Sequence, residues 1–390
     1  MLNRRILRIK AMQALYGYFI STESAEKMYR QEVIDKYELD PAVHDFADKE
    51  IFRERQKNIG VAYDQRLKDP KFKPDNLEDD AWEDIKEAVS KYESRAANHK
   101  REVKDKMMSQ AHDLHKWYLY LLTLPGELAF IDKQGREKRE QAYIKKNEKW
   151  CFNLSSNPVI EELNAFPLVV QGSIEHKIVW KDHFESLRDW YKDVLSKDEG
   201  FIQYQELVEP TLEDHKNAVL DLYKKIVFKH DAVETFFEQL DMSWAEDKPI
   251  LKSLVLKTVK SFEPDLPEKF DMKPLSYNLE EDFEFFEELF KETLKRDTEL
   301  ESIIAKRTKN WDNERIAKLD MIILKMAITE MMTFPSVPIK VTINEFIEIS
   351  KNYSSPKSKQ FVNGILDVLA NELTSEGLIR KSGRGLIDNK

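Results

Sequence analysis

Apolar residues recur every three or four positions along most of the chain, a spacing typical of amphipathic α-helices. The clearest series lies near the end, between Pro338 and Pro356, and a second series begins just after Pro356. Proline fixes φ and lacks a backbone N–H, so these prolines favour breaks between helices. The pattern predicts two helices joined by a short polar loop. Their apolar positions are Val341, Ile343, Phe346, Ile347 and Ile349, then Phe361, Val362, Ile365, Leu366 and Leu369.

The same periodicity predicts helices over much of the remaining sequence. A first helix is expected over residues 1–22, another over 100–125 that ends at Pro125-Gly126, and further helices from about residue 174. Residues 262–280 carry three prolines, so we interpret them as a linker. Glycine is scarce, with 10 residues, whereas Lys and Glu are abundant. The chain is therefore predicted to be all-α.

Composition and motifs restrict the class of function. The formal charge of −10 opposes a globally basic nucleic-acid-binding surface, but it leaves room for a local basic patch. The single cysteine, Cys151, excludes an intramolecular disulfide and a Cys-based zinc site. No triad, Walker loop, dinucleotide fingerprint or metal-ligand spacing is present. We therefore expect a non-enzymatic protein without a metal or cofactor.

The lengths of the apolar runs indicate where the protein is located in the cell. No apolar run approaches the ~20 residues of a membrane span, and the basic N-terminus is not followed by a secretory apolar segment. The expectation is a soluble, cytoplasmic protein with no membrane partner.

Two short basic segments are candidates for nucleic-acid contact. Lysine, serine and an aromatic residue at 357–361 suit phosphate contact and base stacking, although the residue chemistry alone favours a solvated helix start with a core Phe361. Arg4, Arg5 and Arg8 cluster at the beginning of the first helix, where positive charge opposes the helix dipole. That cluster indicates either an anionic partner or a frayed basic terminus.

Five motifs in consistent order resemble one family. They are Arg4–Tyr16, Phe285–Phe290, Asn310–Leu324, I-N-E-x-I-E-I-x-K at Ile343–Lys351 and K-x-F-V-N-G-I-L-D at Lys359–Asp367. This set is similar to NusB, the family of bacterial transcription antitermination factors. The resemblance implies an all-α, NusB-like helical bundle with a large additional helical insert.

The resemblance also implies a domain organisation. Residues 1–22 would be the first helix of the bundle, 280–374 its C-terminal helical body and 375–390 a flexible tail. The insert would span 23–275. Within the insert, Leu222–Trp244 aligns without a gap with Leu289–Trp311. This match indicates either a degenerate NusB-like repeat near residues 216–262 or a coincidence between two amphipathic helices.

The family's activity gives the functional expectations. A NusB protein binds boxA RNA of ribosomal transcripts together with NusE, a small-subunit ribosomal protein, and joins the RNA polymerase elongation complex. By resemblance, acidic residues would meet NusE at Glu314 and Asp320, although a helix-start acid explains both equally well. The residues that match RNA-facing positions are Arg4, Arg5, Arg8, Lys357, Ser358, Lys359, Gln360 and Phe361.

Other interpretations remain open. Gln360 and Lys357 depart from the residues that many NusB proteins carry there, so the charge has moved along the segment. The chain could instead be a ribosome-assembly or protein-docking adaptor with little RNA binding. A NusB-like domain also begins certain RNA cytosine methyltransferases, and a remnant of such an enzyme is a further alternative.

Overall fold

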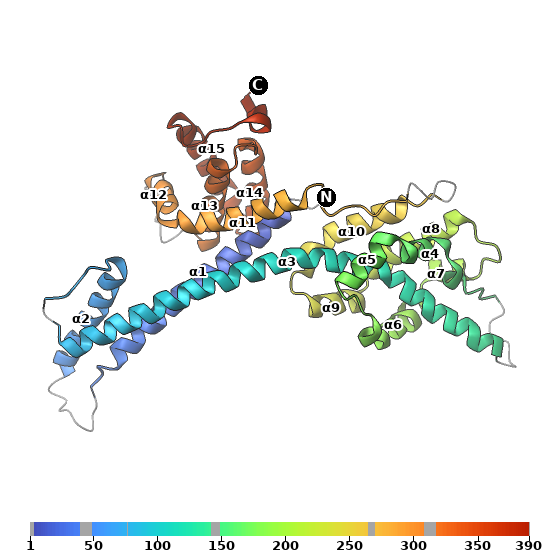
Figure 1. Ribbon diagram of the computed structural model, residues 1–390, viewed down its shortest axis with the longest axis horizontal. Helices are drawn as coiled ribbons and strands as arrows, with labels where there is room; N and C mark the ends of the chain where they lie inside the picture. Colours follow the sequence, from blue (N-terminus) through green and yellow to red (C-terminus); the bar gives the residue numbers. More distant parts are fainter. Residues whose placement is uncertain are drawn as a thin grey trace. The chain divides into compact units, whose positions relative to one another are not determined.

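The computed structural model describes residues 4–39, 49–75, 77–141, 149–263, 270–307 and 317–389. Within these ranges the regular structure is entirely helical, so the predicted all-α fold is confirmed. The chain forms two compact units (Figure 1). Unit 1 contains residues 1–7 and 109–284, and unit 2 contains residues 8–108 and 285–390. The predicted insert is therefore divided between both units.

Unit 2 includes an arm, which we define as residues 23–100. Its helices are α1 (Arg4–Asp35), α2 (Lys49–Lys68) and the first part of α3 (Asp79–Gln141), and Figure 1 shows α2 beside the far end of α1 and α3. The arm has an apolar core of its own. That core consists of Val33, Ile59, Ala62, Tyr63, Ala81, Ile85, Ala88 and Val89.

The first helix does not end near residue 22 as predicted. The Ser-Thr-Glu-Ser sequence there is typical of a helix start, but Thr22 Oγ1 instead donates to the backbone oxygen of Tyr18 at 2.5 Å. A threonine hydroxyl bonded in this way stays within a continuous helix. The helix therefore runs on to Asp35 and enters the arm.

The C-terminal body of unit 2, residues 285–389, is a bundle around α13. Every side of α13 is buried in its middle, from Ile322 to Met331, because α12, α14 and α15 all pack against it. The two helices predicted around Pro356 are confirmed as α14 and α15. The body's helices are α11 (Leu279–Lys295), α12 (Asp297–Arg307), α13 (Lys318–Thr333), α14 (Ile339–Tyr353) and α15 (Ser358–Ser375).

The segment predicted as a flexible tail packs against this body. Gly377, with φ of 73°, ends α15, and the next two amides return to the carbonyl of Leu373. The amide of Ser382 then donates to the Pro335 oxygen at 3.0 Å, and a short 3-10 helix, η9 (Gly383–Asn389), follows. A Cβ on Gly385 would lie 2.0 Å from that same oxygen, so only glycine allows this approach.

Unit 1 is built around the second part of α3, which continues through Pro125 instead of ending there. Proline cannot donate to the carbonyl four residues earlier, which belongs to Leu121. The buried hydroxyl of Tyr223 donates to that oxygen at 2.7 Å. A tertiary contact thus replaces the lost helical bond, and the helix extends to Gln141.

Short helices cover this part of α3. Trp190, Phe237 and Trp244 are buried among them, and the rings of Phe237 and Trp244 stack at 4.3 Å between centroids. The helices are α4 (Pro158–Ala165), α5 (Pro167–Glu175), α6 (Phe184–Asp189), α7 (Glu199–Gln205), α8 (Leu212–Asp221), α9 (Asp231–Leu240) and α10 (Trp244–Lys260), with π-helices η4 (Trp190–Val194) and η6 (Leu222–Val227).

The order of helices bears on the predicted internal repeat. The first copy would consist of three successive helices of unit 1, namely α8 extended by η6, then α9, then α10. The second copy would consist of α11, α12 and α13. Leu222 and Leu289 occupy the first helix of each series. Trp311, the last aligned position, lies outside the described residues. The duplication stays a prediction.

Candidate nucleic-acid interface

The predicted RNA-facing segment lies at the start of α15. Ser354 ends α14, Pro356 follows in the loop, and Lys357 is the residue before the first turn of α15. Lys357, Lys359 and Gln360 are exposed. The N-terminus of a helix carries partial positive charge and unpaired backbone N–H groups, so two exposed lysines there form a local anion-attracting surface.

Ser358 lies between the two lysines but faces the interior. Its side chain is buried, and its hydroxyl donates to Asp320 Oδ2 at 2.5 Å. The hydroxyl of Ser354 donates to Ser358 Oγ at 2.9 Å, and Ser355 Oγ lies 2.8 Å away. This cluster fixes the loop before α15. It thereby holds the neighbouring lysines on the outside, and Ser358 acts as an anchor for the loop.

The structure places Asp320 away from the surface. It is 5% exposed on α13, and its other oxygen, Oδ1, accepts no hydrogen bond from the described residues. A buried carboxylate that faces Ser358 is not presented to a protein partner. Glu314, the second predicted partner contact, lies outside the described residues. We therefore leave Asp320 out of the partner surface proposed below.

Phe361 is half-buried in the first turn of α15. Its neighbour Val362 is fully buried on the core side of the same helix. Part of the Phe361 ring therefore remains accessible at the edge of the core, beside the exposed Lys359 and Gln360. This position is compatible with both interpretations of the sequence, a core-edge residue and a stacking surface.

Arg8 belongs to the interior of the body. Its Nε lies 2.6 Å from Glu330 Oε2 and its Nη2 lies 2.7 Å from Glu330 Oε1, and both side chains are almost fully buried. The guanidinium also lies over the ring of Phe285 at 5.2 Å, and Thr342 donates to Glu330 at 2.7 Å. A bidentate buried pair of this kind joins α1 to α13. Arg8 is thus a packing residue, and we leave it out of the RNA surface.

The other two arginines of the cluster lie in unit 1. Arg4 donates to Asp282 at 2.8 Å and to Glu281 at 2.7 Å, so α1 is tied to the beginning of α11. Arg5 is half-buried. The ion pairs of Arg4 and Arg8 give these two residues a role in packing that requires no RNA. Of the three predicted arginines, Arg5 and the partly exposed Arg4 retain access to solvent.

Sequence reasoning missed a groove of about 700 Å³ in unit 2, lined by parts of α1, α3, α12 and α13. Lys325 is buried there, 2.6 Å from Asp297 and 3.0 Å from Glu301. Glu23 and Glu26 add carboxylates from α1, and Glu23 pairs with Lys318. The acidic start of α12, D-T-E-L-E, was the part of this groove that is visible in the sequence. The other lining residues come from segments far away in the sequence, so the groove itself could not be predicted.

Two negative findings apply to the described residues. No group of three or more His, Cys, Asp or Glu side chains among them could hold a metal ion. None of their helices is both long enough and apolar enough to cross a membrane.

Comparison with known proteins now places this geometry in a family. Residues 250–371 match the model of the NusB family. The transcription antitermination protein NusB of Salinibacter ruber is 48% identical over 104 residues, 27% of this chain and 65% of that protein. The NusB protein of Koribacter versatilis is 44% identical over 100 residues, 25% of this chain and 68% of that protein.

The chain belongs to the NusB family. The NusB match begins within α10 and ends within α15, so it includes the exposed lysines, the Ser358 anchor and Glu330. A third relative, NusB of Chloroherpeton thalassium, is 50% identical over 90 residues, 23% of this chain and 43% of that protein. The chain thus spans less than two thirds of the Salinibacter and Chloroherpeton relatives. No solved structure matches the chain.

Proposed function

We propose that this protein is an RNA-binding transcription antitermination factor that recognises boxA-like single-stranded RNA with NusE and joins the RNA polymerase elongation complex. Membership of the NusB family supports the general role. The observation that carries RNA binding is the pair of exposed lysines, Lys357 and Lys359, at the positive end of α15 on both sides of a buried anchor. Such a role would place the protein in the cytoplasm.

The chemistry of the segment suits single-stranded RNA. Lys357 and Lys359 would neutralise phosphates, and backbone N–H groups at the start of α15 would donate to a phosphate oxygen. Gln360 can both donate and accept at a base edge, and the accessible part of Phe361 can contact a base. The formal charge of −10 makes binding depend on this local patch, because the protein as a whole repels RNA.

The groove of unit 2 is our candidate for the contact with NusE. Its lining holds four carboxylates, which could face a basic partner, and three lysines. Lys325 holds the carboxylates of Asp297 and Glu301 in place, and Lys318 pairs with Glu23. Electrostatic complementarity of this kind raises association rates and orients the partner. Glu26→Lys with Glu301→Gln should weaken binding of NusE and leave binding of RNA alone unchanged.

The test is fluorescence anisotropy of a labelled boxA-like RNA with the full chain, at low and high salt, with and without NusE. Lys357→Glu with Lys359→Glu should weaken binding at least about tenfold and reduce the salt slope by about 2. Lys68→Glu with Lys71→Glu is the matched control, because it makes the same charge change at exposed positions of the arm.

Equal losses in both double variants would show a general charge effect and contradict a site at α15. Binding of NusE without any RNA binding would favour the protein-docking adaptor instead.

A further inference from the structure

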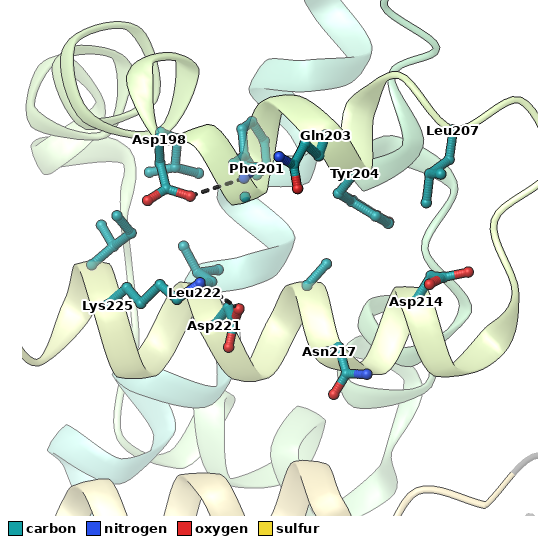
Figure 2. Close-up of a pocket in the computed structure, with 14 residues that line it drawn as sticks. Asp198, Phe201, Gln203, Tyr204, Leu207, Asp214, Asn217, Asp221, Leu222 and Lys225 are labelled. Atoms are coloured by element: carbon teal, nitrogen blue, oxygen red, sulfur yellow. Dashed lines mark hydrogen bonds and ion pairs between the residues drawn. The ribbon is translucent and has the colours of Figure 1, made fainter.

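A groove of about 390 Å³ lies in unit 1, outside the segment that matches NusB (Figure 2). One wall is α7 and the other is α8 with η6, and Figure 2 shows Tyr204 extending from the first wall toward the second. The floor is apolar. Tyr204, Leu222 and Ile226 are each less than one tenth exposed and line it. Leu207 is a further apolar residue of the lining and is 37% exposed.

The rim of this groove is acidic. Asp198, Asp214 and Asp221 line it, and Lys225 is the single lysine among the lining residues, with its ammonium 2.7 Å from Asp221. The stretch 193–227 that builds both walls holds eight acidic residues against four lysines. A field of this sign repels nucleic acid and attracts a cationic ligand.

Two π-helical segments border the groove. Leu195, which lines it, directly follows η4, while Leu222, Lys225 and Ile226 belong to η6. In η6 the amide of Phe228 donates to the carbonyl of Tyr223, five residues earlier, at 3.1 Å. Wide helical turns of this type are rare and occur frequently at functional sites. They are an observation independent of the charge.

The walls also restrict the form of the ligand. Both are helices whose backbone groups are bonded internally, so an extended peptide would gain no main-chain hydrogen bonds from them. A helical ligand satisfies its own backbone and needs only side-chain contacts. An apolar floor between charged rims matches a helix with aliphatic residues on one face and basic residues beside them.

We propose that this groove docks a cationic amphipathic helix of a partner protein. Aliphatic side chains at positions i and i+3 or i+4 would pack on Tyr204, Leu222 and Ile226. Lysine or arginine side chains of the ligand would face Asp198, Asp214 and Asp221. The groove gives the extra region a docking activity that is separate from RNA binding, and the proposal stands whether or not α15 binds RNA.

The probe is a fluorescent synthetic peptide of leucine and lysine with helical periodicity, titrated with the full chain in an anisotropy assay. Two comparison peptides are needed: the same composition scrambled to remove the periodicity, and a leucine–glutamate peptide. The leucine–lysine peptide should bind and weaken with added salt. The scrambled peptide should bind at least about fivefold more weakly, and the leucine–glutamate peptide should not bind.

Variants locate the site. Ala218→Tyr fills the groove from the α8 wall and should reduce affinity at least about tenfold, whereas Ala232→Tyr on the exposed face of α9 is the matched control. Asp221→Lys should weaken binding about fivefold, and Lys225→Glu should strengthen it. Circular dichroism confirms that each variant is folded.

Absence of binding by the leucine–lysine peptide would overturn the proposal. Equal affinity for the Ala218→Tyr and Ala232→Tyr variants would do the same, because it would show attraction to the acidic surface in general.

Discussion

The buried pair of Arg8 and Glu330 allows a quantitative test of how α1 is held in unit 2. Two hydrogen bonds of 2.6 and 2.7 Å join the guanidinium to the carboxylate, and the side chains are 3% and 0% exposed. Thr342 adds a third bond to Glu330, and Glu345 lies 3.9 Å from the guanidinium. Replacing either partner leaves an uncompensated charge in the interior.

The expected loss in the free energy of unfolding follows from that geometry. Among the described contacts, Arg8→Met leaves the Glu330 carboxylate with the Thr342 hydroxyl, and Glu330→Met leaves the guanidinium with the distant Glu345 and aromatic rings. Breaking a buried pair from one side costs about 3–5 kcal/mol. The double variant removes both charges and fills a similar volume, so it should lie within about 1 kcal/mol of the parent or above it.

Hydrogen exchange, followed by mass spectrometry over α1, α13 and α14, measures this loss of local stability without assuming that the whole chain unfolds in two states. A loss of about 3 kcal/mol corresponds to exchange about 100-fold faster in each single variant. The double variant should exchange close to the parental rate. If the singles and the double were equally destabilised, the loss would come from packing, and the ion-pair reasoning would be refuted.

Three further predictions concern other parts of the chain. Tyr223→Phe should cost about 1–3 kcal/mol in urea denaturation because it leaves a carbonyl of α3 unpaired, whereas Tyr277→Phe, at an 82% exposed site, should have little effect. Gly385→Ala should release the C-terminal segment from Pro335, and limited proteolysis there should speed up at least about tenfold. Burial lowers the pKa of His115, so the unfolded state binds more protons below pH ~6.5 and the folded state loses stability as the pH is lowered. His115→Gln should reduce this pH dependence in urea denaturation, and an unchanged dependence would contradict the role given to His115.

Much of the body could be predicted from sequence because its signals are local. The apolar spacing around Pro356 located α14 and α15, and the family motifs placed the exposed lysines at the start of α15. Helical periodicity depends only on neighbours three and four residues away. The all-α class follows from the same property.

Contacts between distant segments could not be read in this way. Arg8 belongs to a basic cluster in the sequence, but its partner is 322 residues away. Pro125-Gly126 predicts a helix end, and only Tyr223 from another segment shows why α3 continues. Ser358 resembles its lysine neighbours in polarity, yet it is buried by Asp320 from α13. In each case a tertiary partner reverses the local expectation.

The central claim is that this protein reduces termination through RNA bound at α15. The most direct measurement is in vitro transcription with RNA polymerase, NusE and a template that carries boxA upstream of a terminator. Our account predicts that the protein increases read-through on this template, that a template without boxA shows no increase, and that Lys357→Glu with Lys359→Glu abolishes the effect. Unchanged read-through with the wild-type protein, under conditions where it binds the RNA, would contradict the antitermination role.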